Sequence, residues 1–275
     1  PILGGVLVEP IGWRGILGVV AAFTGLLVVM VLLWVPESLP AERRHDGGLR
    51  MLLDGTRELA RDHVLVRLLF INALSFGLLM AYLSAAPFVL RNVLGMGTVA
   101  YTAVFGLCGA TVTVTIAVAA SLVRRFSQAR QVRVGLIAGL VVDTVFAGVC
   151  LMWLREPVTG PERMPLLVAV VALFLAHVAC LGLSMGNAPA LALDRTGRWA
   201  GTGSALLGFL QFVVGGLVSP LVGLTGEASG VAFGVVIVAV GAVANVLAVF
   251  GLRERGEKQR LAAQVTECRQ QRLGQ

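Results

Sequence analysis

The fold class is decided by residues 166–193, which read LLVAVVALFLAHVACLGLSMGNAPALAL. This stretch contains no Asp, Glu, Lys or Arg. The hydrocarbon core of a bilayer is about 30 Å thick, so about 20 apolar residues are enough for a helix to cross it. Strands of a membrane barrel are about ten residues long and alternate between apolar and polar residues. The stretch therefore predicts a membrane-spanning helix rather than a barrel strand.

Similar stretches recur along the chain, and the sequence predicts seven complete spans. The other six are Ile16–Val35, Leu68–Leu90, Val99–Val123, Val134–Leu154, Ala200–Leu224 and Val231–Leu252. Pro1–Val8 is typical of the end of an eighth span. Because the first residue is Pro1 rather than Met, we expect the chain to be an N-terminally truncated fragment.

The composition excludes an ordinary soluble enzyme. Hydrophobic residues make up 57% of the 275 residues, charged residues only 13%, and the mean hydropathy is +0.88. An ordinary soluble domain has about 25% charged residues, because its surface must stay in contact with water. A net charge of +7 would suggest nucleic acid in a soluble protein. Here we expect the chain to lie in a lipid bilayer and to bind no nucleic acid.

The positions of the basic residues predict the orientation of the spans. If the segment before Ile16 lies outside, the inner segments are 36–67, 124–133, 194–199 and the tail from Arg253, and they hold 18 of the 22 basic residues. Such a bias is the positive-inside pattern of membrane proteins, so we expect a cytoplasmic C-terminus. Within residues 36–67 the pattern also predicts a short amphipathic helix near Leu49–Ala60.

Several short motifs resemble the drug-efflux members of the major facilitator superfamily. Pro1, Gly4 and Gly5 are similar to the end of the antiporter motif in its fifth helix. Residues 12–14 (Gly-Trp-Arg) and 36–38 (Pro-Glu-Ser) stand before and after the span Ile16–Val35. The same motifs bracket the sixth helix of these drug-efflux transporters. Residues 82–90 are similar to the seventh helix of the Bcr/CflA drug-resistance group, and residues 187–193 with 200–211 resemble the junction of its tenth and eleventh helices.

This resemblance implies an all-α polytopic membrane protein, the C-terminal six-helix bundle of a major facilitator transporter with helix 6 and the end of helix 5. Residues 1–35 would end the N-terminal half, 36–67 would be a cytoplasmic linker, 68–252 the bundle and 253–275 a cytoplasmic tail. The implied function is proton-coupled efflux (antiport) of drugs or other small amphipathic compounds across a bacterial-type plasma membrane. The implied partner is the missing N-terminal half. The alternative is a non-transporting membrane protein, such as a sensor, a scaffold or a truncated product.

Two titratable residues near the middle of spans are candidates for proton coupling. Asp143 is the only acidic residue deep inside a predicted span, and His177 lies near the middle of another. A charge inside a membrane is costly, and imidazole titrates near neutral pH, so the two could form a proton relay. The alternatives are a neutral Asp143 and a His177 that is simply packed and hydrogen-bonded.

Polar residues on three spans are candidates for a substrate cavity, with interhelical packing as the alternative. Asn72, Ser75 and Tyr82 share one face of their helix at about 100° per residue. A second stripe of polar residues, on the predicted span Ala200–Leu224, contains Ser204 and Gln211. Asn187, with Pro189, is expected to interrupt its helix, unless the proline only marks the nearby helix end.

Two pairs of glycines predict close helix contacts, Gly135 with Gly139 and Gly182 with Gly186. The sequence contains no Walker A motif, no Cys/His cluster with metal-ligand spacing and no Ser/His/Asp or HExxH arrangement. We therefore expect no enzyme, no metal and no cofactor.

Overall fold

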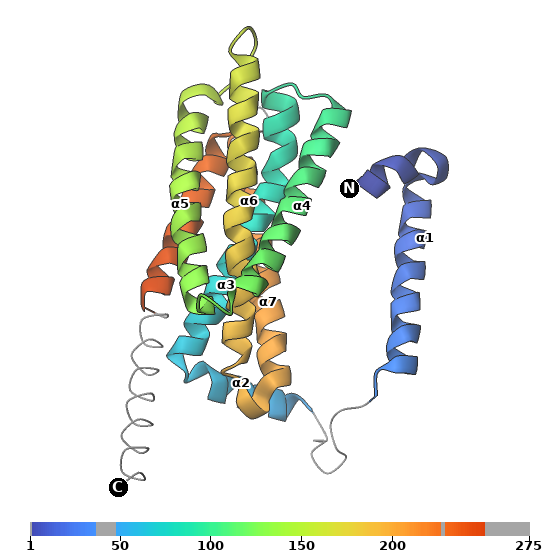
Figure 1. Cartoon of the computed structure of the whole chain (residues 1–275), viewed down its shortest axis with the longest axis vertical. Coiled ribbons are helices and arrows are strands. Elements are labelled where there is room, and N and C mark those ends of the chain that lie inside the picture. The colour runs from blue at the N-terminus through green and yellow to red at the C-terminus, as the bar shows by residue number, and fades with distance from the viewer. Residues whose placement is uncertain (1, 37–47, 227–228, 251–275) are drawn as a thin grey trace.

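The structure is a computed structural model that describes residues 2–36, 48–226 and 229–250. These residues include seven helices long and apolar enough to cross a membrane, which confirms the predicted all-α polytopic fold (Figure 1). In chain order they are α1 (Ile2–Trp34), α3 (His63–Pro87), α4 (Thr98–Leu122), α5 (Gln128–Trp153), α6 (Arg163–Leu193), α7 (Ala200–Val218) and the last helix (Val231–Phe250). Pro1, residues 37–47 of the predicted linker and the predicted tail 253–275 lie outside the described residues.

Four shorter elements complete the described chain. The predicted amphipathic helix is present as α2 (Leu49–Ala60). A π-helical turn, Phe88–Val93, extends α3, while 3₁₀ turns at Gly197–Trp199 and Ser219–Gly223 flank α7. Helix α3 begins at His63, so the last residues of the segment 36–67 are already part of a bundle helix.

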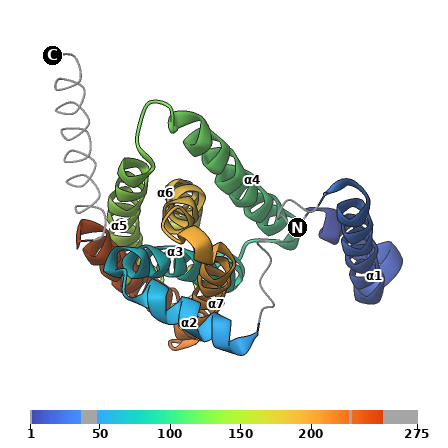
Figure 2. The same ribbon diagram turned by 90° about the horizontal axis from the view of Figure 1, so that it is seen from below.

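Helix α6 is the central element of the bundle. Seen along the helices, it lies between α5 and α4, with α3 and α7 beside it (Figure 2). It packs closely against α5, α4 and α3, and α3 in turn packs along most of α7.

Glycine makes the close contacts of α6 possible. A Cβ atom on Gly135 of α5 would lie 2.8 Å from the carbonyl oxygen of Cys180, and one on Gly182 of α6 would lie 2.7 Å from the Cβ of Thr115 in α4. Both distances are too short for real atoms, so the helix backbones approach closely only because no side chain stands there. The two predicted glycine contacts are thereby confirmed, one on each side of α6.

Helix α6 runs without a break from Arg163 to Leu193, although Pro189 lies inside it. The expectation that Asn187 and Pro189 interrupt this helix is therefore wrong. A proline removes one backbone hydrogen bond, and membrane helices tolerate the loss because neighbouring groups satisfy the freed carbonyl.

An aromatic cluster fills one half of the core. The ring of Phe174 in α6 lies 5.3 Å from those of both Phe146 in α5 and Tyr82 in α3, and 6.0 Å from that of Phe233 in the last helix. Aromatic pairs at these separations stabilise packing beyond the area that they bury. The cluster joins α6 to three other helices.

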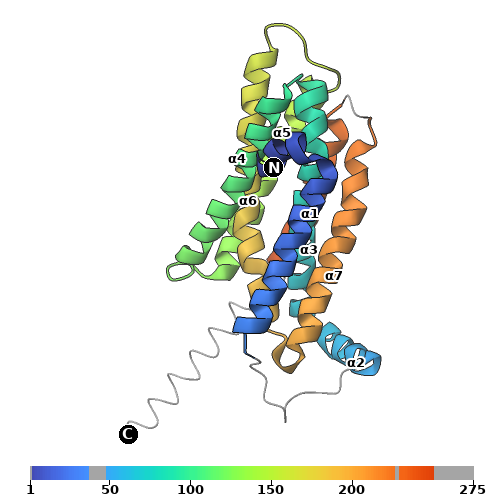
Figure 3. The same cartoon turned by 90° about the vertical axis from the view of Figure 1, so that its right-hand side faces the viewer.

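Helix α1 stands beside the bundle rather than within it (Figures 1 and 3). Its most apolar stretch is not buried, and its main contact is with α4. Gly12 has φ 65° and ψ 178°, values that favour glycine and that divide α1 into two helical segments. The break separates Gly4 and Gly5 from the first complete span.

Helix α2 lies across one end of the bundle, beneath α3 and α7 (Figure 2). Asp62 caps the N-terminus of α3 by accepting hydrogen bonds from the backbone N–H groups of Val64 and Leu65. The Arg195 guanidinium donates to the same carboxylate, at 2.6 Å and 2.8 Å. A second ion pair joins Arg198 to Glu58 of α2 at 2.7 Å. These contacts tie α2 and the start of α3 to the turn between α6 and α7.

The glycine contact between α5 and α6 is tested by Gly135→Leu. We expect it to destabilise the fold by about 1–3 kcal/mol, because the new side chain overlaps Cys180 and Leu183 of α6. The measurement is the melting temperature of the purified protein in detergent. Gly148→Leu is the matched control, since it lies on the same helix with no atom within 4 Å of its Cβ position. Equal melting temperatures for the two variants would contradict the close-contact account.

The Asp62 contact predicts a pH dependence. Burial raises the pKa of Asp62, but the hydrogen bonds from Arg195 and the backbone outweigh it, and the pKa is lowered. A lowered pKa means that the stabilisation is fully present above the ordinary carboxyl value of about 4 and is lost as the pH falls through the lowered value.

Asp62→Asn keeps a side chain that can cap α3 but removes the charge that pairs with Arg195, so it should lower stability by about 0.2–1 kcal/mol near neutral pH. The difference from the unchanged protein should shrink in acid, where Asp62 is protonated. Asp54→Asn, which removes only an exposed pair with Arg57, serves as control in the same melting series. A difference that persists unchanged at acidic pH would contradict the assignment.

Candidate functional site

The two titratable residues predicted inside spans lie in direct contact. Nδ1 of His177 in α6 lies 2.5 Å from Oδ1 of Asp143 in α5. Both side chains are almost fully buried, with residue exposures of 3% and 1%. A buried carboxylate is stabilised by a hydrogen-bonded cationic partner, and a neutral pair can share one hydrogen bond. The arrangement can therefore hold a proton at either atom of the contact.

Glycine brings this pair together. Asp143 lies two helical turns beyond Gly135, on the same close seam between α5 and α6. On its other side the pair faces the last helix at Gly241, where a Cβ atom would lie 3.5 Å from Oδ2 of Asp143. The carboxylate is thus enclosed by α5, α6 and the last helix.

Titratable groups from α3 and α4 complete the surroundings of the pair. The ring of Tyr82 lies 6.3 Å from the ring of His177, and the Tyr82 hydroxyl faces the Cys108 thiol of α4. The Cys180 thiol, one turn along α6 from His177, is a further titratable neighbour, within electrostatic reach of Asp143. The group of Asp143, His177 and Tyr82 thus joins three helices, and we call it the polar core cluster.

Two polar atoms at this place have no hydrogen-bond partner among the described residues: Nε2 of His177 and the hydroxyl of Ser184. Beside them lies a cavity of about 10 Å³, lined by Asp143, His177, Ser184 and Gly241 together with apolar side chains. This is about the room that one water molecule needs. Buried polar atoms without partners are uncommon and require an explanation, so the cluster is a candidate site and not only packing.

A second polar contact joins α3 to α7. The side-chain amide of Asn72 donates to the amide oxygen of Gln211 at 3.4 Å, so two of the predicted cavity residues contact each other. Gln211 is half-buried, and the rings of Phe209 and Phe212 on the same helix are exposed. Ser204, also predicted for the cavity, lies exposed near the start of α7.

The other predicted cavity residues are buried within the helix packing. The Ser75 hydroxyl donates to the carbonyl of Ile71 in its own helix, 2.9 Å away. The Asn187 amide donates to Oε1 of Gln131 in α5 at 3.3 Å and to the carbonyl of Leu183 at 2.9 Å. Tyr82 belongs to the polar core cluster. The structure thus does not bring the predicted cavity residues together at one place.

Three interhelical contacts were not predicted from the sequence. Gln131 accepts from Asn187, Ser84 of α3 lies 2.5 Å from Ser219 beyond α7, and Asn245 of the last helix donates to the Leu136 carbonyl at 2.9 Å. Asn245 is a lone amide inside an apolar span, the same signal that selects Asn72, and could have been found. Across the described residues, no group of three His, Cys, Asp or Glu side chains is arranged to hold a metal ion.

Curated relatives match this chain over part of their own length. An uncharacterized MFS-type transporter, YdgK of Bacillus subtilis (strain 168), is 27% identical over 258 residues, which cover 92% of this chain and 60% of the relative. A bicyclomycin resistance protein homolog of Haemophilus influenzae (strain ATCC 51907 / DSM 11121 / KW20 / Rd) is 26% identical over 223 residues, which cover 81% of this chain and 53% of the relative. No solved structure matches the chain significantly.

The family follows from a match over most of the chain. The sequence profile of the Major Facilitator Superfamily matches residues 1–220, which run from the start of the chain to the end of α7. The chain spans about three fifths or less of the curated relatives that it matches. The seven apolar helices among the described residues and this match together show an integral membrane protein. The chain belongs to the major facilitator superfamily.

Proposed function

We propose that this chain is part of a proton-coupled efflux transporter for drugs or other small amphipathic compounds and contains its C-terminal six-helix bundle. The observation that carries the proposal is the buried contact between His177 and Asp143 in the seam of a major facilitator bundle. A charged pair inside a membrane is expensive and serves ion movement more often than stability. The bicyclomycin resistance homolog among the relatives supports efflux of a drug-like compound.

The proposed organisation follows the predicted boundaries. Residues 1–35 end the N-terminal half, 36–67 form a cytoplasmic linker whose last residues already belong to α3, 68–252 form the rest of the bundle and 253–275 a cytoplasmic tail. The protein lies in a bacterial-type plasma membrane with its C-terminus in the cytoplasm, because the basic residues gather on that side. Transport then consists of rocking of the two halves around a site near the middle of the membrane.

The proposed substrate cavity lies along α3 and α7. Asn72 and Gln211 bond each other in this structure, so both amides can exchange that bond for one to a ligand. The exposed ring of Phe212, which follows Gln211 in α7 and lies 5.4 Å from the ring of Phe76 in α3, supplies apolar contact area. Amide groups next to aromatic surface suit an amphipathic compound, and Ser204 extends the polar edge of this face.

The proposed proton carrier is the polar core cluster. When His177 and Asp143 are both charged, the pair holds α5 and α6 together; a proton added to the carboxylate weakens the attraction. The Tyr82 ring and the Cys108 and Cys180 thiols are the titratable groups that face it. Proton binding would thereby alter the contact between α6, which is central in the bundle, and α5.

The coupling role is tested with the full-length protein in liposomes, with bicyclomycin as the first compound and an imposed pH gradient. We expect liposomes with Asp143→Asn to accumulate no more of the compound under the pH gradient than liposomes without protein. The reason is that the side chain at position 143 can no longer take up a proton. Downhill exchange of the compound should remain, because the substrate cavity is unchanged.

Thr144→Val is the matched control, since it removes the neighbouring polar group of the same helix, whose hydroxyl bonds only the Leu140 carbonyl. Asp143→Glu restores a carboxyl and should restore part of the gradient-driven uptake. If Asp143→Asn folds and still accumulates the compound against the gradient, Asp143 is not the coupling residue.

A further inference from the structure

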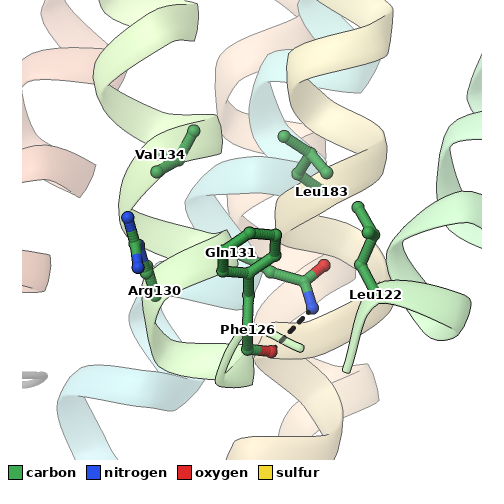
Figure 4. Close-up of a pocket in the computed structure, with 6 residues that line it drawn as sticks. All are labelled: Leu122, Phe126, Arg130, Gln131, Val134 and Leu183. Carbon is green, nitrogen blue, oxygen red and sulfur yellow. Dashed lines mark hydrogen bonds between the residues drawn. The ribbon is translucent and has the colours of Figure 1, made fainter. Parts of the chain in front are cut away.

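A pocket of about 260 Å³ lies at the arginine-rich end of α4 and α5, away from the polar core cluster. Its walls come from three elements and the loop between α4 and α5 (Figure 4). They are Leu122, Phe126, Arg130, Gln131, Val134 and Leu183. Most of this lining is apolar, and one guanidinium lies among it.

The pocket follows from the way α6 separates its neighbours. Both α4 and α5 approach α6 closely, and they lie on different sides of it (Figure 2). The residues between Leu122 and Gln128 connect the two helices, so the pocket lies under this connection with Leu183 of α6 as its floor. Gln131 keeps the connection in place by donating to the Phe126 carbonyl at 3.2 Å.

The segment that connects α4 and α5 at this end carries only positive charges. Residues 124–133 contain Arg124, Arg125, Arg130 and Arg133 and no acidic residue. In contrast, the arginines of the turn between α6 and α7 are neutralised, Arg195 by Asp62 and Arg198 by Glu58. Within the described residues, none of the four arginines of 124–133 forms an ion pair.

Arg130 is held at the pocket by an aromatic contact. Its guanidinium carbon lies 5.0 Å from the centre of the Phe126 ring. A cation over an aromatic face is attracted to it, yet all N–H groups of the guanidinium remain able to donate. A guanidinium so placed is well suited to bind a phosphate group.

The pocket continues into a face that meets lipid. Val134 is 50% exposed, and Ile137 and Val141, which follow at helical spacing along α5, are 58% and 60% exposed. In a membrane such an apolar stripe contacts acyl chains. A ligand that enters the pocket from this side therefore has an apolar chain along α5 and a polar group at the arginines.

We propose that this pocket binds an anionic glycerophospholipid of the surrounding bilayer. One acyl chain lies against Leu122, Val134 and Leu183, and the phosphate accepts hydrogen bonds from Arg130, with the neighbouring arginines adding attraction. Basic pockets between membrane helices are typical sites for anionic headgroups.

The test is native mass spectrometry of the full chain in detergent with phosphatidylglycerol and, separately, phosphatidylcholine with the same acyl chains. We expect phosphatidylglycerol to bind more tightly. Arg130→Gln should weaken phosphatidylglycerol about fivefold, which corresponds to about 1 kcal/mol for one arginine near a membrane surface. Val134→Phe, which fills the groove and keeps every charge, should weaken both lipids.

Arg198→Gln is the matched control, because its guanidinium also lies over an aromatic ring, 5.1 Å from that of Trp199, but is already paired with Glu58. It should leave lipid binding unchanged. Glycerol phosphate, which has the charge but no acyl chain, should not displace the lipid. Equal binding of the two phospholipids, unchanged binding in Arg130→Gln, or displacement by glycerol phosphate would each overturn the proposal.

Discussion

The close approach of α6 to α5 and α4 at glycine residues is the contact on which the rest of the bundle depends. Lipid tails are as apolar as leucine side chains, so membrane helices associate through close packing and polar contacts and not through the hydrophobic effect. Gly135 on α5 and Gly182 on α6 allow this packing on the two sides of one helix. The position of α6 then determines where the aromatic cluster around Phe174 forms and how far α4 and α5 stand apart.

The same seam explains why a carboxylate and an imidazole are found deep inside an apolar bundle. Asp143 and His177 lie on the facing sides of α5 and α6, so each satisfies one polar atom of the other. Nε2 of His177 has no partner within the described part of the chain, which leaves the cluster with unused hydrogen-bonding capacity. A packing contact alone does not require a titratable pair at this place, whereas a proton carrier does.

Much of the fold could be predicted from the sequence, because the bilayer imposes simple requirements. The seven spans, the amphipathic helix α2 and the glycine contacts all follow from length, hydropathy and residue size. The rotation of each helix about its axis could not be predicted, because nearly every face of a membrane helix is apolar. Ser75 and Asn187 were therefore assigned to a cavity, although the structure buries both. Pro189 was expected to interrupt α6, although the loss of one backbone hydrogen bond leaves the helix intact.

We propose that a transported proton binds at the contact between Asp143 and His177. Infrared difference spectra of the full-length protein, recorded between acidic and neutral pH in lipid, test it directly through the stretching band of a protonated carboxyl group. If Asp143 takes up this proton, the spectra contain a band of a buried carboxyl group that changes with pH, and this band is absent in Asp143→Asn. Identical difference spectra for the unchanged protein and Asp143→Asn would contradict the proposal, because Asp143 would then keep one protonation state throughout.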